Sequence, residues 1–137
     1  EKERGSVFEG LVQHAPALLN AFQIGVKASS FGFDWPDAGE AFGKIEQESE
    51  ELKEAMNSGG KKAVFHEVGD LIFAAANVSR LLGINPELAL KEANNRFIER
   101  FTSMEKALTA GGRRLAEFSL DEMEKMWESV KGETEDY

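Results

Sequence analysis

The sequence contains no cysteine, few prolines and no long apolar run. Without cysteine, neither a disulfide framework nor a zinc site built on thiolates can form, which suits a reducing, cytoplasmic location. The longest apolar runs are much shorter than the ~20 residues that a membrane span requires. The opening stretch, EKERGSVFEG, also lacks the apolar core of a secretory signal. We therefore expect a cytoplasmic protein with no membrane partner.

Positive charge is scarce as well. The sequence has 16 Lys and Arg residues against 25 Asp and Glu residues, which gives a formal net charge of -9. Proteins that bind nucleic acids present a basic face, so this excess of acid argues against a nucleic-acid partner. An acidic protein can still bind a polyphosphate when metal ions lie between the two.

Helix-capping signals recur along the chain, and no segment has a convincing strand pattern. The 137 residues, 42% of them hydrophobic, are enough for one domain with a real core. We predict an all-α fold, with four main helices in a bundle and a short fifth helix at the C-terminus. The expected helices span about 16–30, 38–57, 61–82, 86–110 and 120–131. The predicted domain covers residues 15–131, preceded by a linker or arm (1–14) and followed by a frayed tail (132–137).

Two carboxylates interrupt the most apolar segment of the chain. The stretch FHEVGDLIFAAANVSRLLG, residues 65–83, carries Glu67 and Asp70 among apolar or small side chains. An unpaired ionised carboxylate in a packed interior is so unfavourable that a cation or a set of donors must compensate it. We therefore expect positive charge close to these two acids.

Helical spacing places polar groups on the core faces of three predicted helices, because residues three and four apart share a face. In the second helix Glu48 falls inside the apolar stripe, and Glu51 lies beside it. In the third, Glu67 completes an apolar row that Asp70 borders. In the fourth, Asn94 occupies the missing place in a seam formed by Leu90, Phe97, Phe101, Met104 and Leu108.

Two such acid pairs on adjacent antiparallel helices would bring four carboxylates together. Hard divalent cations such as Mg²⁺ take oxygen ligands and commonly bridge carboxylates to substrate phosphates. The predicted ligands of this metal site are Glu48, Glu51, Glu67 and Asp70. Taken alone, the segment EQESEELKE also fits a solvated helix face. A ferritin-like di-iron site is disfavoured, because neither histidine has a Glu three residues before it.

Four segments resemble, in order and spacing, the MazG nucleoside triphosphate pyrophosphohydrolases of the all-α NTP pyrophosphatase superfamily. They are GFDWPD, KIEQESEELKEA, HEVGDLIFAAANVSRLLG and ALKEANNRFIERF, and the resemblance covers about residues 15–127. The family pattern, ExxE followed after a gap by ExxD, matches Glu48 with Glu51 and Glu67 with Asp70. The opening residues also resemble the segment before the second domain of longer, tandem MazG proteins, which suggests a C-terminal half.

The resemblance implies Mg²⁺-dependent hydrolysis of nucleoside triphosphates to a monophosphate and pyrophosphate, with Mn²⁺ as a substitute metal and nucleotide-pool house-cleaning as a role. Glu48 and Glu51 would be the candidate catalytic bases. Trp35, with its neighbours Phe31 and Phe33, could stack a base, although such aromatics are often core plugs. Further candidate contacts to the substrate are Asn94, on the core face, and four basic residues that could instead be solvated surface groups, Lys27, Lys91, Arg96 and Arg100.

The sequence departs from the family pattern at several positions. Gln47 stands where a second acid is frequent, which would weaken a second metal ion. Gly25 replaces a side chain that is usually Gln, and Glu92 and Glu99 stand where positive charge is frequent. These changes bear on rate and on nucleotide preference more than on the class of reaction.

Two further expectations concern assembly and an alternative function. Apolar residues lie on more than one face of three predicted helices, Phe65 and Phe73 among them, so we expect a homo-oligomer, a dimer or a pair of dimers. The alternative function is a helical dimerisation or regulatory module, with weak or no catalysis, within a larger MazG-type protein. All four acids of the predicted metal site are present, which favours the enzyme.

Overall fold

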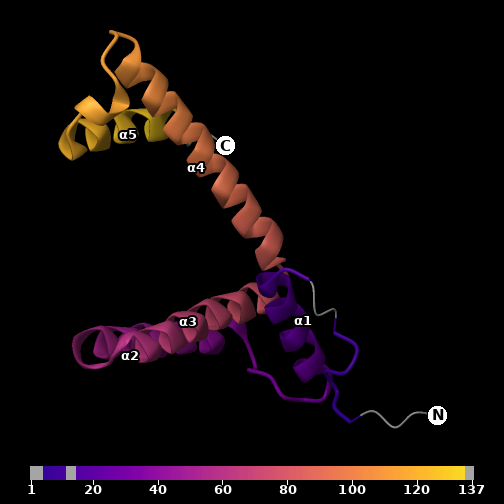
Figure 1. The fold of residues 1–137 in the computed structure, drawn as a ribbon. Helices are drawn as coiled ribbons and strands as arrows, with labels where there is room; N and C mark the ends of the chain where they lie inside the picture. Colours follow the sequence, from indigo (N-terminus) through magenta and orange to yellow (C-terminus); the bar gives the residue numbers. More distant parts are fainter. Residues whose placement is uncertain (1–4, 12–14, 135–137) are drawn as a thin grey trace. The chain divides into compact units, whose positions relative to one another are not determined.

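The computed structural model describes residues 5–11 and 15–134, which form five α-helices and one short 3-10 helix and contain no strand (Figure 1). The all-α prediction is therefore confirmed. The helices are α1 (Ala17–Ser30), α2 (Ala38–Ser58), α3 (Lys61–Leu81), α4 (Pro86–Thr109) and α5 (Leu120–Thr134), with the 3-10 helix η1 at Leu115–Glu117. None of these helices is both long enough and apolar enough to cross a membrane.

The helix ends lie close to the predicted positions, because local capping groups fix them. Asp37 Oδ1 accepts a hydrogen bond from the Glu40 amide at 2.8 Å and caps α2. After α3, Gly83 adopts a φ of +74°, which glycine reaches without steric strain. Helix α5 continues to Thr134, three residues beyond its predicted end. The rest of the predicted tail, and residues 1–4 and 12–14 of the predicted arm, lie outside the described residues.

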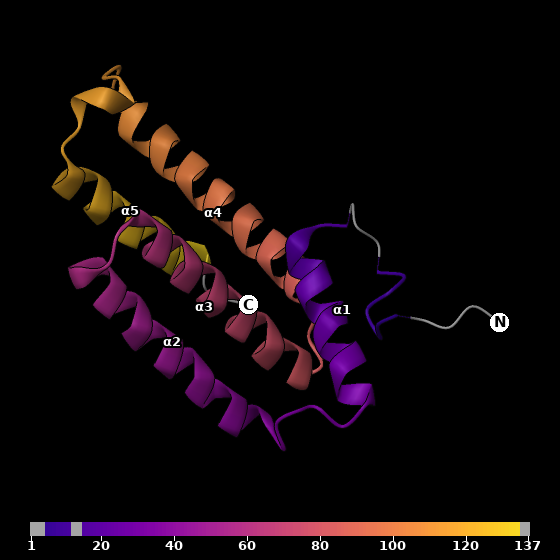
Figure 2. The same ribbon diagram turned by 60° about the horizontal axis from the view of Figure 1, so that its bottom comes forward.

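The chain forms two compact units, Glu1–Ala89 and Leu90–Tyr137, and each is described by itself. In the first unit, α2 and α3 form a helical hairpin and lie side by side along their length, and α1 packs on α3 (Figures 1 and 2). Small side chains fill the centre and allow the helices to approach closely. Buried residues of this core are Gly25, Ala41, Ala55, Ala74, Ala76 and Val78.

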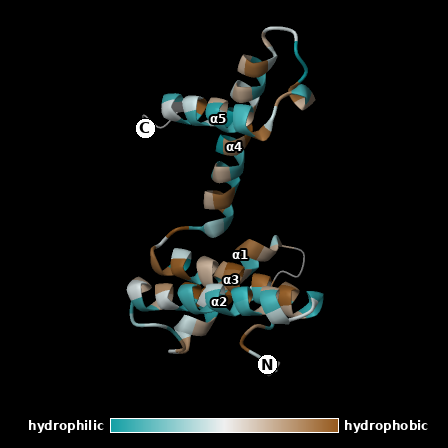
Figure 3. Ribbon diagram, turned by 90° about the vertical axis from the view of Figure 1, so that its left-hand side faces the viewer, coloured by the Kyte–Doolittle hydropathy of each residue, from teal (hydrophilic) through white to brown (hydrophobic). Residues whose placement is uncertain are grey.

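The second unit contains most of α4, η1 and α5. Apolar and hydrophilic segments alternate along α4 (Figure 3), which is typical of an amphipathic helix. The buried hydrophobic residues of this unit are Met104 on α4 and Val130 on α5. The Trp127 ring of α5 lies 5.2 Å, between centroids, from the Phe97 ring of α4. This ring contact joins α5 to α4 within the unit.

Candidate metal centre and active site

The α2–α3 hairpin brings acids from two helices together. One carboxylate oxygen each from Glu48, Glu51 and Glu67 lies within 4.8 Å of the others. Glu67 also forms a second such group with Asp70 and His66. The two groups share Glu67, so the four predicted metal ligands belong to one acidic cluster at this part of the hairpin. The cluster arises because Glu48 and Glu67 each occupy a core-facing position on helices that run side by side.

Glu48 is the most buried member of this cluster, with only 5% of its surface exposed. Its Oε1 lies 3.1 Å from Lys44 Nζ, one turn earlier on α2. The hydrogen bond to Glu48 raises the pKa of Lys44 above its ordinary value, so the lysine stays charged. Lys44 thus supplies positive charge beside Glu48, and the positive charge expected close to Glu67 and Asp70 stays a prediction. The alternative of a solvated helix face is wrong for Glu48.

Two carboxylate oxygens in the cluster are buried without a hydrogen-bond donor. They are Glu48 Oε2 and Glu67 Oε2, and neither has a partner among the described residues. Burial, and then the negative charges of Glu51, Asp70 and Glu48, raise the pKa of Glu67. Buried acceptors of this kind normally have a partner. A hard divalent cation, which prefers oxygen ligands, would satisfy both, so the residues present fit a metal ion of the Mg²⁺ class.

The other two acids of the cluster have local partners. Glu51 Oε1 accepts a hydrogen bond from Gln47 Nε2 at 3.2 Å. Gln47 therefore orients Glu51. Asp70 Oδ2 lies 3.1 Å from His66 Nε2, in a largely exposed pair on α3. Both contacts leave the second oxygen of each carboxylate for another ligand.

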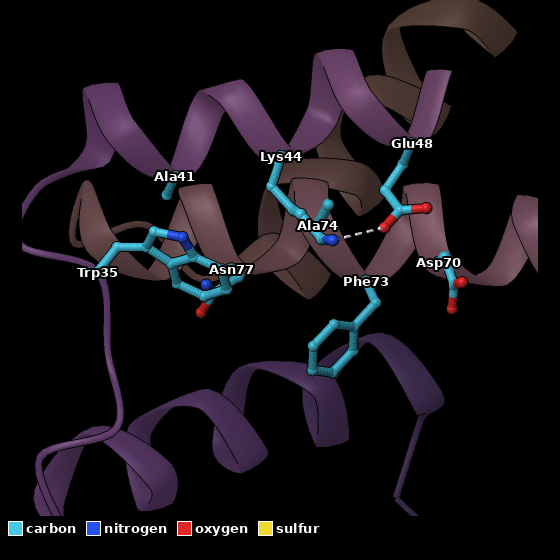
Figure 4. A pocket seen from close by; sticks show the side chains of 8 residues that line it. All are labelled: Trp35, Ala41, Lys44, Glu48, Asp70, Phe73, Ala74 and Asn77. Atoms are coloured by element: carbon cyan, nitrogen blue, oxygen red, sulfur yellow. Dashed lines mark ion pairs between the residues drawn. The ribbon is translucent and has the colours of Figure 1, made fainter. Parts of the chain in front are cut away.

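A pocket of about 200 Å³ extends from the acidic cluster along the hairpin. Glu48 and Asp70 line one end, Trp35 and Asn77 line the other, and Lys44 lies between them (Figure 4). Ala41, Phe73 and Ala74 complete the wall. The arrangement places a charged end, suited to metal and phosphate, next to an end with an aromatic and an amide, suited to a planar polar group.

Trp35 reaches this pocket because its loop is tied to α3. Arg80 of α3 makes two hydrogen bonds to the Asp34 carboxylate, with Nη2 at 2.6 Å from Oδ1 and Nη1 at 3.2 Å from Oδ2. The Asp34 carboxylate also accepts from the Trp35 amide at 2.8 Å. Phe31 and Phe33, by contrast, are mostly exposed, so they are not core plugs.

The structure places the remaining predicted substrate contacts elsewhere on the chain. Lys27 lines a different pocket, together with residues 7–11. Four of them belong to α4 in the second unit, namely Lys91, Asn94, Arg96 and Arg100. Arg96 Nη1 lies 3.4 Å from Glu92 Oε1 on the same exposed helix face. The part that these five residues play in binding stays a prediction.

Several pocket residues were not predicted from the sequence. Lys44 lies four residues before Glu48, so helical spacing alone could have identified it. Asn77 follows Asp70 by two helical turns and is a buried polar residue in an apolar helix, which is also a detectable signal. The pairing of Asp34 with Arg80 joins residues 46 positions apart, and no local pattern indicates it.

The model of the family described as phosphoribosyl-ATP pyrophosphohydrolase matches residues 29–97, just over half of the chain. The chain belongs to this family. The matched segment contains all four acids of the cluster, as well as Trp35 and Asn77. It therefore includes the complete lining of the pocket beside the acidic cluster.

Curated relatives with MazG-type names agree with the family match. The chain is 41% identical over 117 residues, 85% of its length, to the nucleoside triphosphate pyrophosphohydrolase/pyrophosphatase MazG of Thermotoga maritima. It is 34% identical over 133 residues, 96% of its length, to the nucleoside triphosphate pyrophosphohydrolase of Escherichia coli K12. The similarity to MazG proteins is thus confirmed. The chain spans about half the length of these relatives, 45% and 51% respectively.

A third relative matches a shorter part of the chain. The uncharacterized protein YabN of Bacillus subtilis is 44% identical over 69 residues, which are 50% of this chain and 14% of that protein. The same MazG-like segment therefore also occurs within a much longer protein.

Proposed function

We propose that this MazG-like chain hydrolyses nucleoside triphosphates between the α and β phosphorus atoms, releasing a nucleoside monophosphate and pyrophosphate. The observation that supports the proposal most directly is the pair of buried, unpartnered carboxylate oxygens of Glu48 and Glu67, in the acidic cluster whose Glu48 and Asp70 line the charged end of the pocket. The names of the Thermotoga maritima and Escherichia coli relatives support the same reaction class. Removal of unwanted nucleotides from the cellular pool is the role that we propose for this activity.

Glu48, Glu51, Glu67 and Asp70 would hold the metal, for which we propose Mg²⁺ with Mn²⁺ as a substitute. When bound, such an ion neutralises phosphate charge and lowers the pKa of a coordinated water. Glu48 or Glu51 would act as the base that takes the proton from the attacking water. Lys44 fixes the position of Glu48 through Oε1, so Oε2 would be the oxygen that serves as metal ligand or base.

The nucleoside part of the substrate would occupy the uncharged end of the pocket. Trp35 offers an aromatic face on which a base can stack. Lys27, Lys91, Arg96 and Arg100 are the proposed contacts to phosphate oxygens, and Asn94 the proposed contact to the sugar or to metal-bound water. Basic side chains favour such roles because charge-assisted hydrogen bonds to phosphate are strong.

We also propose that the chain assembles into a homo-oligomer, a dimer or a pair of dimers. Phe65, Val68 and Ile72 lie on one side of α3 at spacings of three and four residues and are all exposed, Phe65 by 83%. A contiguous apolar stripe of this kind marks an interaction surface. A second copy of the same helix face would bury it symmetrically.

The experiment is an incubation of the chain with canonical and damaged ribo- and deoxyribonucleoside triphosphates, in Mg²⁺ or in chelator. The expected products are pyrophosphate and the monophosphate, formed only in the presence of metal. Phosphate as the primary product would contradict cleavage between the α and β phosphorus atoms. No turnover of any nucleotide in Mg²⁺ would favour the regulatory module instead.

A further inference from the structure

Arg80 connects the loop before α2 to the floor of the pocket. Its side chain is only 9% exposed and uses all three guanidinium nitrogens. Two of them hold the Asp34 carboxylate, and the third, Nε, donates to Asn77 Oδ1 at 2.9 Å. The three side chains Asp34, Arg80 and Asn77, here called the Asn77 clamp, form one continuous hydrogen-bonded chain.

The Asn77 clamp determines which way the Asn77 amide faces. A guanidinium group has only donors, so the amide atom next to Arg80 Nε must be the oxygen of Asn77. The NH₂ group then lies on the other branch of the amide and is the part left to meet a pocket occupant. Asn77 is 6% exposed and lines the pocket beside Trp35 (Figure 4). A rotated amide would set two donors against each other.

The polar side-chain groups at this end of the pocket are therefore donors. Trp35 can only donate through Nε1, and Asn77 presents NH₂ because its oxygen is directed toward Arg80. The acceptors among the lining residues, Glu48 and Asp70, lie at the opposite, charged end. A free asparagine can pair with adenine through both a donor and an acceptor, but the Asn77 oxygen is directed toward Arg80 Nε, and the NH₂ group lies on the other branch of the amide.

We propose that Asn77, held by Arg80 and Asp34, selects nucleotides whose base carries a carbonyl oxygen at the exocyclic position. Such bases are guanine, hypoxanthine, uracil and thymine, whose O6 or O4 can accept from the Asn77 NH₂. Adenine and cytosine present an amino group there, and two donors would face each other. This inference rests on the proposed function, because it assigns the base that the triphosphate carries.

Gly25 shows that α1 is shaped to accommodate this clamp. A Cβ at position 25 would lie 2.6 Å from Arg80 Nε and 3.0 Å from Asn77 Oδ1. Both atoms are held in hydrogen bonds, so a side chain there would displace the very contact that orients Asn77. The absence of a side chain at position 25 thus has a physical reason in this chain. Arg80 occupies that space.

The test compares kcat/KM for GTP and ITP with ATP, and for UTP with CTP, in the parent chain and in Asn77→Asp. We expect the parent to favour the carbonyl-bearing bases by about tenfold, the size of one well-placed hydrogen bond to a base. Asn77→Asp keeps an oxygen for Arg80 and replaces the NH₂ by an acceptor, so the preference should disappear or reverse. A merely structural role would lower all rates and leave the ratio unchanged, and that result would overturn the inference.

Two further variants test the clamp without changing Asn77. Arg80→Lys keeps a charge for Asp34 but lacks the planar fork that also reaches Asn77, and Gly25→Ala crowds the same contact. In both variants the ratio of kcat/KM for carbonyl-bearing bases to kcat/KM for amino-bearing bases should fall close to one. An unchanged preference in both variants would show that Arg80 does not orient Asn77.

Binding separates this inference from the proposed reaction. Calorimetry with non-hydrolysable α,β-imido triphosphates in Mg²⁺ should give the same order of base preference, expressed as a ratio of Kd values. If the chain binds guanine analogues more tightly but hydrolyses nothing, the reaction fails and the inference stands. If it hydrolyses all bases at equal kcat/KM, or binds none of the analogues, the inference fails.

Discussion

Glu48 is a buried carboxylate whose two oxygens have different surroundings. Oε1 is 3.1 Å from Lys44 Nζ, and Oε2 is buried without a donor. A buried ion pair rarely adds net stability, and a buried acceptor without a partner lowers it. A purely structural role therefore explains neither the burial of Glu48 nor the three acids around it. Its geometry instead suits a ligand that arrives from outside the chain.

Replacement of Lys44 by methionine tests this description of Glu48. The variant leaves the buried carboxylate unpaired, so we expect the free energy of unfolding in chelator to fall by about 1–2 kcal/mol. Mg²⁺ should raise the free energy of unfolding of the variant by more than it raises that of the parent, because the metal then supplies the missing positive charge. Denaturant titrations with and without metal measure both effects.

The matched control for that variant is Lys53→Met. Lys53 Nζ lies 3.2 Å from Glu50 Oε1 on the same helix, but both side chains are 69% exposed. Removal of an exposed pair should change stability by less than about 0.5 kcal/mol and leave the response to Mg²⁺ as in the parent. Equal losses in the free energy of unfolding of the two variants would mean that the pair of Lys44 with Glu48 contributes no more to stability than an exposed pair.

Individual site residues could be predicted where the signal was local. Glu48 and Glu67 were found because helical spacing places them on apolar faces. The Asn77 clamp could not be found in this way, since Asp34 and Arg80 are distant in sequence and meet only when α1 packs on α3. The burial of Glu48 could not be predicted from the sequence either, because the acidic segment around it fits a solvated face equally well.

At the scale of the helices, capping groups determine where each element begins. Ser119 and Glu122 form a capping box at α5, in which each side chain accepts a hydrogen bond from the backbone amide of the other residue, at 3.0 and 3.2 Å. The hydrogen bond from the Ser119 amide, and to a smaller extent the charge of Arg113, lower the pKa of Glu122. Such local signals explain why the helix starts were predicted well.

The Glu122→Gln variant gives a pH-dependent prediction for α5. Because the pKa of Glu122 is lower in the folded chain, its ionised form stabilises the fold at pH values above 4.5, the ordinary pKa of a glutamate. That contribution disappears as the pH falls through the lowered pKa. We expect the variant to melt below the parent at pH 7 and the difference to shrink toward pH 3, as followed by circular dichroism. A difference that grows on acidification would contradict the capping role.

The packing of the helices was less predictable than their ends. Sequence periodicity identifies the apolar side of each helix, but not which helix it meets. The pairing of α2 with α3 follows from their short connection at Gly59 and Gly60, whereas the contact of α1 with α3 has no local signal. The end of α5 was placed too early, because the polar residues after Lys131 resemble a tail.

At the scale of the whole molecule, the exposed stripe on α3 predicts self-association. Phe65→Ser removes the most exposed aromatic of this stripe, so the variant should dissociate at protein concentrations at which the parent is oligomeric. Light scattering over a dilution series measures the shift. Phe33→Ser is the control, because Phe33 is equally exposed at 81% but lies outside α3. A parent that is monomeric at micromolar concentration would contradict the prediction.

We interpret the acidic cluster as a site that binds metal for catalysis. Carboxylates about 5 Å apart repel one another by roughly 3 kcal/mol per pair at an effective dielectric constant of ~20, before relaxation or protonation reduces the figure. Asp70→Asn removes one charge at nearly constant shape. The exposed contact of Asp70 with His66 that it weakens is worth about 1 kcal/mol at most. Metal-free stability should therefore not fall when this charge is removed.

The most direct test is the melting temperature of Asp70→Asn in chelator and in Mg²⁺, measured beside its rate of pyrophosphate release. In chelator we expect the variant to melt at the same temperature as the parent or above it. In Mg²⁺ the parent should gain stability and the variant much less, while pyrophosphate release falls by about 100-fold or more. A variant that melts clearly below the parent in chelator and keeps its activity would show that Asp70 is a structural residue, and would contradict the metal centre.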